Sequence, residues 1–122
     1  MTPLITSVLD GDLVEIIKLL PCVDIDEINH EGNNSLWFAC YREDREVAAL
    51  LIQHGIDINH QNEGGATALI YSASAGKTEM VELLLEEGAD PSLKTLDDFT
   101  ALDLAANRKI LKMISARTNE RA

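Results

Sequence analysis

The segment Ala75-Gly76-Lys77-Thr78 has the clearest chemical potential in the chain, because it is similar to the end of a phosphate-binding P-loop. That motif surrounds phosphate oxygens with backbone N–H groups, and it needs an earlier glycine and a strand leading into the loop. Here Tyr71 stands at the position of the earlier glycine, and the residues before Gly76 are typical of a helix. We therefore interpret Gly76-Lys77 as a turn between helices and expect no nucleotide site.

Three histidines, His30, His54 and His60, raise the question of a metal site. Zinc sites use closely spaced ligands, as in H-E-x-x-H and C-x-x-C, and the sequence contains neither pattern. The two cysteines, Cys22 and Cys40, do not make a disulfide framework, and we interpret Cys40 as a reduced, buried small residue. The histidines are interpreted as solvated loop residues, and no metal or other cofactor is expected.

Adjacent carboxylates occur at Glu43-Asp44, Glu86-Glu87 and Asp97-Asp98. A catalytic pair needs one carboxyl group in an apolar cleft, so that the two pKa values separate. These pairs fall in predicted turns and helix ends, where water screens both groups. No Ser/His/Asp or Cys/His set is indicated either, although the members of such sets need not be close in sequence. The sequence therefore predicts a protein that is not an enzyme.

The formal net charge of −11 is unevenly distributed. Residues 1–107 contain 20 Asp and Glu against 5 Lys and Arg, a balance of −15, whereas residues 108–122 have a balance of +4. Such a body should repel nucleic acid and anionic lipid, whose binding depends on neutralising phosphates. The charge could attract a basic protein surface, or it could simply keep the protein soluble.

The length of 122 residues is that of one small domain, and aromatic residues make up only 4% of it. We therefore expect a core of Leu, Ile, Val and Ala. The apolar runs are too short to cross a bilayer. The N-terminus has no basic start and soon reaches acidic residues, so we expect no signal peptide and a cytoplasmic location.

The stretch from Gly64 to Pro91 organises the chain. Thr67 can cap a first helix, Gly76 breaks it, and the apolar residues of 80–85 give a second helix its stripe. A left-handed cap is expected at Gly88. One such unit has an apolar face with nothing to bury it against, so it needs copies of itself.

The copies recur with a period of 33 residues: Gly32 falls on Gly65, and Gly55 falls on Gly88, without a gap. The motifs G-A-T-A-L-I-Y-S-A and V-E-L-L-L-E-E-G-A-D-P, with the glycine turn between them, resemble the ankyrin repeat. The resemblance covers practically the whole chain. It implies an all-α ankyrin repeat solenoid of four stacked helix-turn-helix units with β-turn finger loops.

The resemblance divides a single domain, residues 1–122, into repeats at about 1–26, 27–59, 60–92 and 93–118, with a frayed tail at 119–122. Eight helices in four pairs are expected. In the fourth unit we expect a first helix over 98–106 and a second over 110–114, which aligns only if about three residues of the preceding turn are deleted.

Ankyrin proteins typically bind partners through the finger tips and the exposed side of the first helices, the concave side of the stack. Tyr41 with Arg42 is the favoured contact, while Trp37 is interpreted as partly buried between repeats, an alternative that also holds for Phe38. Carried onto this chain, the resemblance implies sixteen partner-binding residues: His30, Glu31, Asn33, Phe38, Tyr41, Arg42, Glu63, Ala66, Tyr71, Ser74, Ala75, Leu96, Asp97, Phe99, Asn107 and Arg108.

The resemblance thus implies a non-catalytic protein-protein interaction module. We expect a partner protein with a basic surface, no nucleic acid, no membrane, and a monomer when free. A sharper hypothesis from the acidic charge is an inhibitor or immunity protein of a basic toxin or enzyme. The alternative is a structural scaffold that assembles by end-to-end stacking of repeats.

Overall fold

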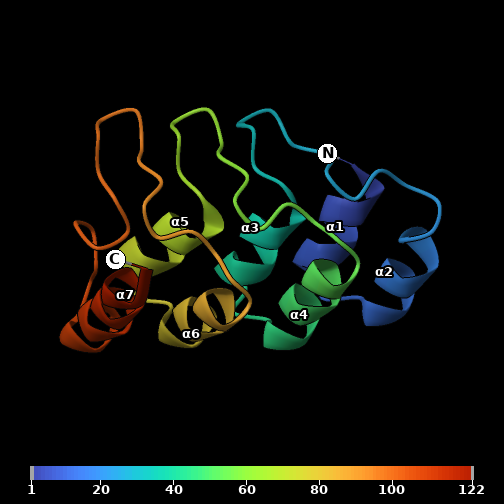
Figure 1. The fold of residues 1–122 in the computed structure, drawn as a ribbon. Coiled ribbons are helices and arrows are strands. Elements are labelled where there is room, and N and C mark those ends of the chain that lie inside the picture. Colours follow the sequence, from blue (N-terminus) through green and yellow to red (C-terminus); the bar gives the residue numbers. More distant parts are fainter. Residues whose placement is uncertain (1, 122) are drawn as a thin grey trace.

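The computed structural model describes residues 2–121, with the side chains of residues 2–118, and shows paired helices beneath projecting loops (Figure 1). The helices lie in two layers: α1, α3 and α5 lie next to the loops, and α2, α4, α6 and α7 lie farther from them (Figure 1). Between residues 2 and 121 there are seven helices: α1 (Pro3–Asp10), α2 (Leu13–Leu19), α3 (Ser35–Tyr41), α4 (Arg45–Gln53), α5 (Ala68–Ser74), α6 (Thr78–Glu86) and α7 (Arg108–Arg121).

Strands are absent from this part of the chain, where a single isolated bridge joins Ile28 to Asn34 at the base of the first loop. None of the helices described is both long enough and apolar enough to cross a membrane. The described chain is therefore all-α, as predicted.

The turn between the two helices of a pair uses a backbone conformation with positive φ. Gly76 has a φ of 74°, and Glu43, one repeat earlier, has a φ of 56°. Thr67 caps α5 by accepting a hydrogen bond from the Ile70 N–H at 3.1 Å, which confirms its predicted role. Since α5 precedes Gly76, the segment similar to a P-loop is a turn between helices, as predicted.

The fourth unit is an exception to the predicted helix pairs. Its first helix, expected over 98–106, is reduced to turns, so the prediction of eight helices is wrong. The Thr100 N–H donates to Asp103 Oδ2 at 2.9 Å, and the Asp103 N–H donates to Thr100 Oγ1 at 3.2 Å, which is a well-formed helix start. After these turns the Ala106 N–H donates to the Ala73 carbonyl of α5 at 2.9 Å, so it makes no helical hydrogen bond within its own segment.

The last helix is longer than the sequence pattern predicts. α7 continues past Ile114 to Arg121, so residues 119–121 of the expected frayed tail are helical, and Ala122 lies outside the described residues. No glycine or proline follows Pro91 in the sequence, and most residues of this segment are good or neutral helix formers. Nothing in the local sequence therefore ends the helix at Ile114.

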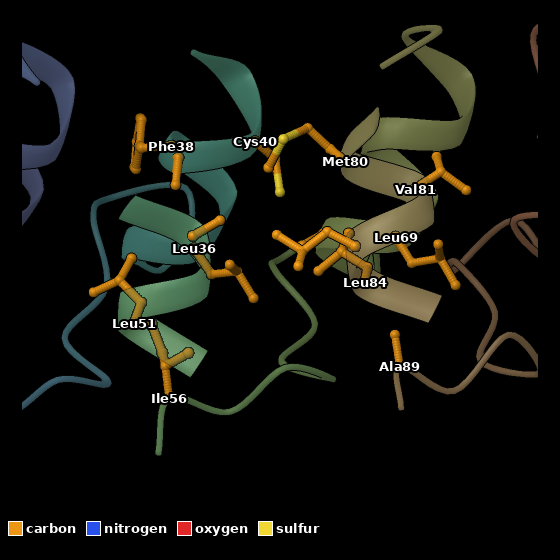
Figure 2. Packing of buried hydrophobic residues seen from close by; sticks show 14 of the residues in the cluster. Leu36, Phe38, Cys40, Leu51, Ile56, Leu69, Met80, Val81, Leu84 and Ala89 are labelled. Atoms are coloured by element: carbon orange, nitrogen blue, oxygen red, sulfur yellow. The ribbon is translucent and has the colours of Figure 1, made fainter. Parts of the chain in front are cut away.

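The hydrophobic core lies between the two helix layers and repeats from one unit to the next (Figure 2). Leu36 and Leu51 fill the second unit, and Leu69 and Leu84 occupy the corresponding positions 33 residues later. All four side chains are buried. Complete burial of a leucine contributes roughly 1.5–3 kcal/mol, so these contacts hold the layers together.

Candidate functional site

The residues predicted to bind a partner map mainly to one side of the molecule, which we call the finger–helix face. It consists of α1, α3 and α5 with the finger loops 29–34, 62–67 and 95–100. One side chain folds each of the first two fingers: Asn29 Oδ1 accepts hydrogen bonds from the Glu31 and Asn33 N–H groups at 3.0 Å, and Asn62 repeats the arrangement 33 residues later. The finger shapes are therefore set locally.

Neighbouring fingers are tied to each other through their backbones. The Glu63 N–H donates to the Glu31 carbonyl at 3.2 Å, and the Leu96 N–H donates to the Gly64 carbonyl at 2.9 Å. The predicted tip residues are all exposed: His30, Glu31, Glu63, Leu96 and Asp97. The fingers thus present these side chains to solvent from a connected backbone.

The equivalent position near the base of each finger carries Asn33, Ala66 and Phe99. Asn33 is only 4% exposed, and its Oδ1 accepts a hydrogen bond from Asn62 Nδ2 at 2.9 Å. It links two fingers, and little of its side chain is open to a partner. Ala66 is half-buried and Phe99 is exposed.

An aromatic cluster lies on the helices of this face and consists of Trp37, Phe38 and Tyr41 from α3 and Tyr71 from α5. The Trp37 ring stacks on Tyr41, with centroids 6.0 Å apart and planes 7° apart, and approaches Tyr71 to 4.4 Å. Trp37 is half-buried against the core, as interpreted from the sequence. Tyr41 is 53% exposed and offers the most accessible ring of the cluster.

Phe38 is part of the core rather than of the surface. It is 8% exposed and packs edge-on against Trp37 with centroids 5.0 Å apart, so it offers little surface to a partner. Tyr71 occupies the same repeat position one unit later and is half-buried. Burial raises the pKa of the Tyr71 hydroxyl, and the nearby Lys77 offsets part of that rise, so the phenol is neutral at pH 7.

Two cationic side chains, those of Lys77 and Arg42, border the aromatic cluster, and both interact with neighbouring groups. Lys77 Nζ lies 3.4 Å from Glu43 Oε2 and 5.9 Å from the centre of the Tyr41 ring. Arg42 Nη1 donates to the Leu9 carbonyl at 2.8 Å, which satisfies a free carbonyl at the end of α1. Arg42 therefore joins the first two units as well as standing on the predicted face.

The remaining predicted residues lie near the end of α5: Ser74, Ala75, Asn107 and Arg108, all of them exposed. The hydrogen bond from Ala106 to Ala73 brings the start of α7 beside this end of α5. Asn107 Oδ1 also accepts from the Ile110 N–H at 2.9 Å and so caps α7. No structural observation tests the role of any predicted residue in binding, and these roles stay predictions.

The histidines and Cys40 were the other residues considered for chemistry, and the structure shows their surroundings. His30 is exposed, but His60 is half-buried with Nε2 2.6 Å from the Gly32 carbonyl, so its interpretation as a solvated loop residue is corrected. Burial raises the pKa of the Cys40 thiol to about 12, with a smaller lowering from Ser72, so the thiol stays protonated. Within residues 2–118 no three His, Cys, Asp or Glu side chains are grouped as a metal site would need.

Sequence reasoning missed Lys77 as a part of the finger–helix face, because the residue was interpreted only as a member of the turn. The signal that could have found it is its position three residues after Ser74, from which a long side chain reaches the Tyr41 ring of α3. It also placed Trp37 between repeats without recognising that its ring links Tyr41 to Tyr71.

The comparisons with known proteins agree on one family. The family description "Ankyrin repeats (3 copies)" matches residues 1–62, and "Ankyrin repeats (many copies)" matches residues 51–105. The chain is similar to the crystal structure of the ankyrin repeat domain of Bcl-3, described as a unique member of the IkappaB protein family, with a TM-score of 0.90 and 29% sequence identity. The match covers 94% of this chain and 51% of that one, so this chain spans about half its length. No curated protein matches the sequence.

Proposed function

This chain belongs to the ankyrin repeat family, and from that premise we propose that it is a non-catalytic module that binds one partner protein through the finger–helix face. Ankyrin repeats generally mediate protein-protein interaction. The observation that carries the proposal is the exposed edge of the aromatic cluster, where Tyr41 stands beside Trp37 on the helices of that face.

Aromatic side chains suit this role energetically. Tyr and Trp are enriched among the few residues that supply most of the binding energy of protein interfaces. Tyr41 is already stacked on Trp37 and bordered by Lys77, so a partner would order little additional structure on binding. The finger backbones are likewise tied to one another before a partner arrives.

The charge of the face indicates the kind of partner. The tips carry the exposed carboxylates of Glu31, Glu63 and Asp97, and residues 1–107 have a charge balance of −15. A basic protein surface would be attracted to them, and the attraction would weaken as salt is raised. In its sharper form, the proposal is that the chain inhibits or neutralises a basic toxin or enzyme by occupying its surface.

Photo-crosslinking tests the location of the binding surface. The crosslinker p-benzoylphenylalanine replaces Tyr41 in one copy and Glu82, an exposed residue of α6 in the other layer, in a matched control. In native lysate, position 41 should crosslink to a basic protein, and the yield should fall at raised salt. Capture at position 82 and not at 41 would contradict the finger–helix face, and capture of an acidic protein would contradict the basic partner.

A single substitution then measures the contribution of the ring. Tyr41→Ala should weaken binding of the identified partner by about tenfold or more, as expected for an interface hot spot. Arg42→Ala is a poorer probe because it also removes the hydrogen bond to the Leu9 carbonyl. A thermal melt of Tyr41→Ala separates lost binding from lost folding.

A further inference from the structure

The outer surfaces of the second helices can be compared position by position. When the helices are aligned by repeat position, two equivalent outward positions can be compared. They are Glu46 and Ala49 in α4, Glu79 and Glu82 in α6, and Lys109 and Lys112 in α7. At the same two positions α2 carries Val14 and Ile17, which are 64% and 53% exposed. Among the helices of this layer, α2 alone presents two large apolar side chains where the others are charged or small.

One of these two side chains, Ile17, also lines a hollow. A cleft of about 300 Å³ lies between α2 and α4 and is lined by Leu13, Ile17, Ala49 and Leu50, with Glu46 and Gln53 as its polar members. Val14 and Ile17 are three residues apart on α2, so they lie on the same side of the helix. One surface therefore contains both a protruding apolar edge and an apolar recess.

We propose that this surface, which we call the α2 face, is the interface of a homodimer in which the α2 helices of two copies pack antiparallel. A two-fold interface pairs a patch with itself, so the patch must contain both the projecting and the receiving parts. The α2 face meets that condition, because Val14 and Ile17 of one copy can enter the α2–α4 cleft of the other. Burial of such side chains is favourable.

The charges along α2 favour the antiparallel arrangement. Asp12 and Glu15 stand at the start of the helix, and Lys18 stands in its last turn. Antiparallel packing places Lys18 of each copy beside the acidic end of the other helix, whereas parallel packing places like charges together. The helix dipoles are also opposed in the antiparallel arrangement. Because each copy carries a charge of −11, the copies repel overall, and the dimer should dissociate on dilution.

The α2 face lies in the layer away from the fingers, so the dimer leaves the finger–helix face free (Figure 1). The inference does not rest on the proposed function. It predicts a dimer at high protein concentration, where the sequence alone led us to expect a monomer.

Sedimentation velocity over about 1 μM to 1 mM tests the proposal. The wild type should pass from monomer to dimer with no larger species. Val14→Glu/Ile17→Glu should raise the dimer dissociation constant about tenfold or more. This variant gives α2 the residues that α6 carries at the same positions, Glu79 and Glu82, so the fold already accepts them. A circular dichroism melt verifies folding.

The matched control is Leu96→Glu/Ala75→Glu, which adds the same charge at exposed positions of the finger–helix face. It should leave the dimer unchanged. A wild type that is monomeric throughout would overturn the proposal, and so would growth beyond a dimer, the mark of end-to-end assembly. Equal dimerisation of wild type and Val14→Glu/Ile17→Glu would also overturn it.

A charge exchange tests the antiparallel geometry separately. Lys18→Glu should weaken the dimer, and the double variant Glu15→Lys/Lys18→Glu should restore it, since the exchanged charges again meet opposite partners. Failure to restore would exclude antiparallel packing of α2. Photo-crosslinking at position 41 should be unaffected by Val14→Glu/Ile17→Glu, so failure of the dimer and failure of the proposed function are distinguishable.

Discussion

The third and fourth units begin with the same kind of cap and differ in the length of the segment after it. Lys77, the residue before α6, lies ten positions after Thr67, whereas Asn107, the residue before α7, lies seven positions after Thr100. The difference of three residues is nearly one helical turn. The third unit has the complete helix α5, and the fourth has a capped turn.

The three missing residues change the first part of the fourth unit and leave α7 in position. Ile110 and Ile114 of α7 are completely buried, at the positions that Met80 and Leu84 occupy in α6. Moving α7 would lose this core contact, so α7 keeps its place in the stack. The segment before it is then too short for a full helix and forms only turns.

The largest expected effect on stability comes from truncating the leucine that occurs at the same repeat position in both units. Leu69 is 1% exposed, but Leu102, at the same repeat position, is only partly buried because no further unit covers it within the described residues. Leu69→Ala should cost about 3–5 kcal/mol of unfolding free energy and Leu102→Ala about 1–2 kcal/mol. Urea denaturation measures both. Equal losses would show that the fourth unit is packed as tightly as the third.

A smaller effect tests the contact between the third and fourth fingers. Gly65 has a φ of 83°, and a Cβ added there would lie 2.8 Å from the Leu96 nitrogen and 3.0 Å from Thr95 Cα. Gly88 has a φ of 90° with open space around a Cβ. Gly65→Ala should cost about 2–3 kcal/mol, and Gly88→Ala about 1 kcal/mol for the backbone conformation alone. If the urea midpoints of the two variants coincide, the finger contact contributes nothing.

Much of the fold follows from the sequence because each unit is determined by short-range features. The 33-residue period, the cap at Thr67 and the break at Gly76 all correspond to local backbone requirements that the structure satisfies. The sequence also indicates that about three residues are missing before α7. It does not indicate which helix is shortened, because that depends on the burial of Ile110 and Ile114 against neighbouring units.

The repeat pattern predicts where the site residues lie in each unit, but it does not predict which of them are buried. The repeat places Phe38 and Tyr71 at equivalent positions, yet Phe38 is buried and Tyr71 is half-buried, because each packs against different neighbours. Asn33 and Arg42 form hydrogen bonds to residues 29 and 33 positions away, which only the stacking of units brings within reach. The apolar residues of the α2 face, Val14 and Ile17, can be read in the sequence, but their exposure is visible only in the structure.

The smallest expected effect concerns the cap that starts the fourth unit. The hydrogen bonds from Thr100 hold the pKa of the Asp103 carboxyl below its ordinary value, whereas the third unit has Ile70 at that position. A carboxyl with a lowered pKa stabilises the fold above its unfolded-state pKa and loses that contribution as pH falls through the lowered value. Wild-type stability should therefore decline more steeply below about pH 4 than that of Asp103→Asn, whose side-chain oxygen still accepts a hydrogen bond without titrating.

Urea midpoints at pH 7 and at several values below pH 4 give the two slopes, with Asp97→Asn, at the exposed tip of the same finger, as the control. The difference should be small because Asp103 is fully exposed, and parallel slopes in wild type and Asp103→Asn would show that the cap does not couple to stability.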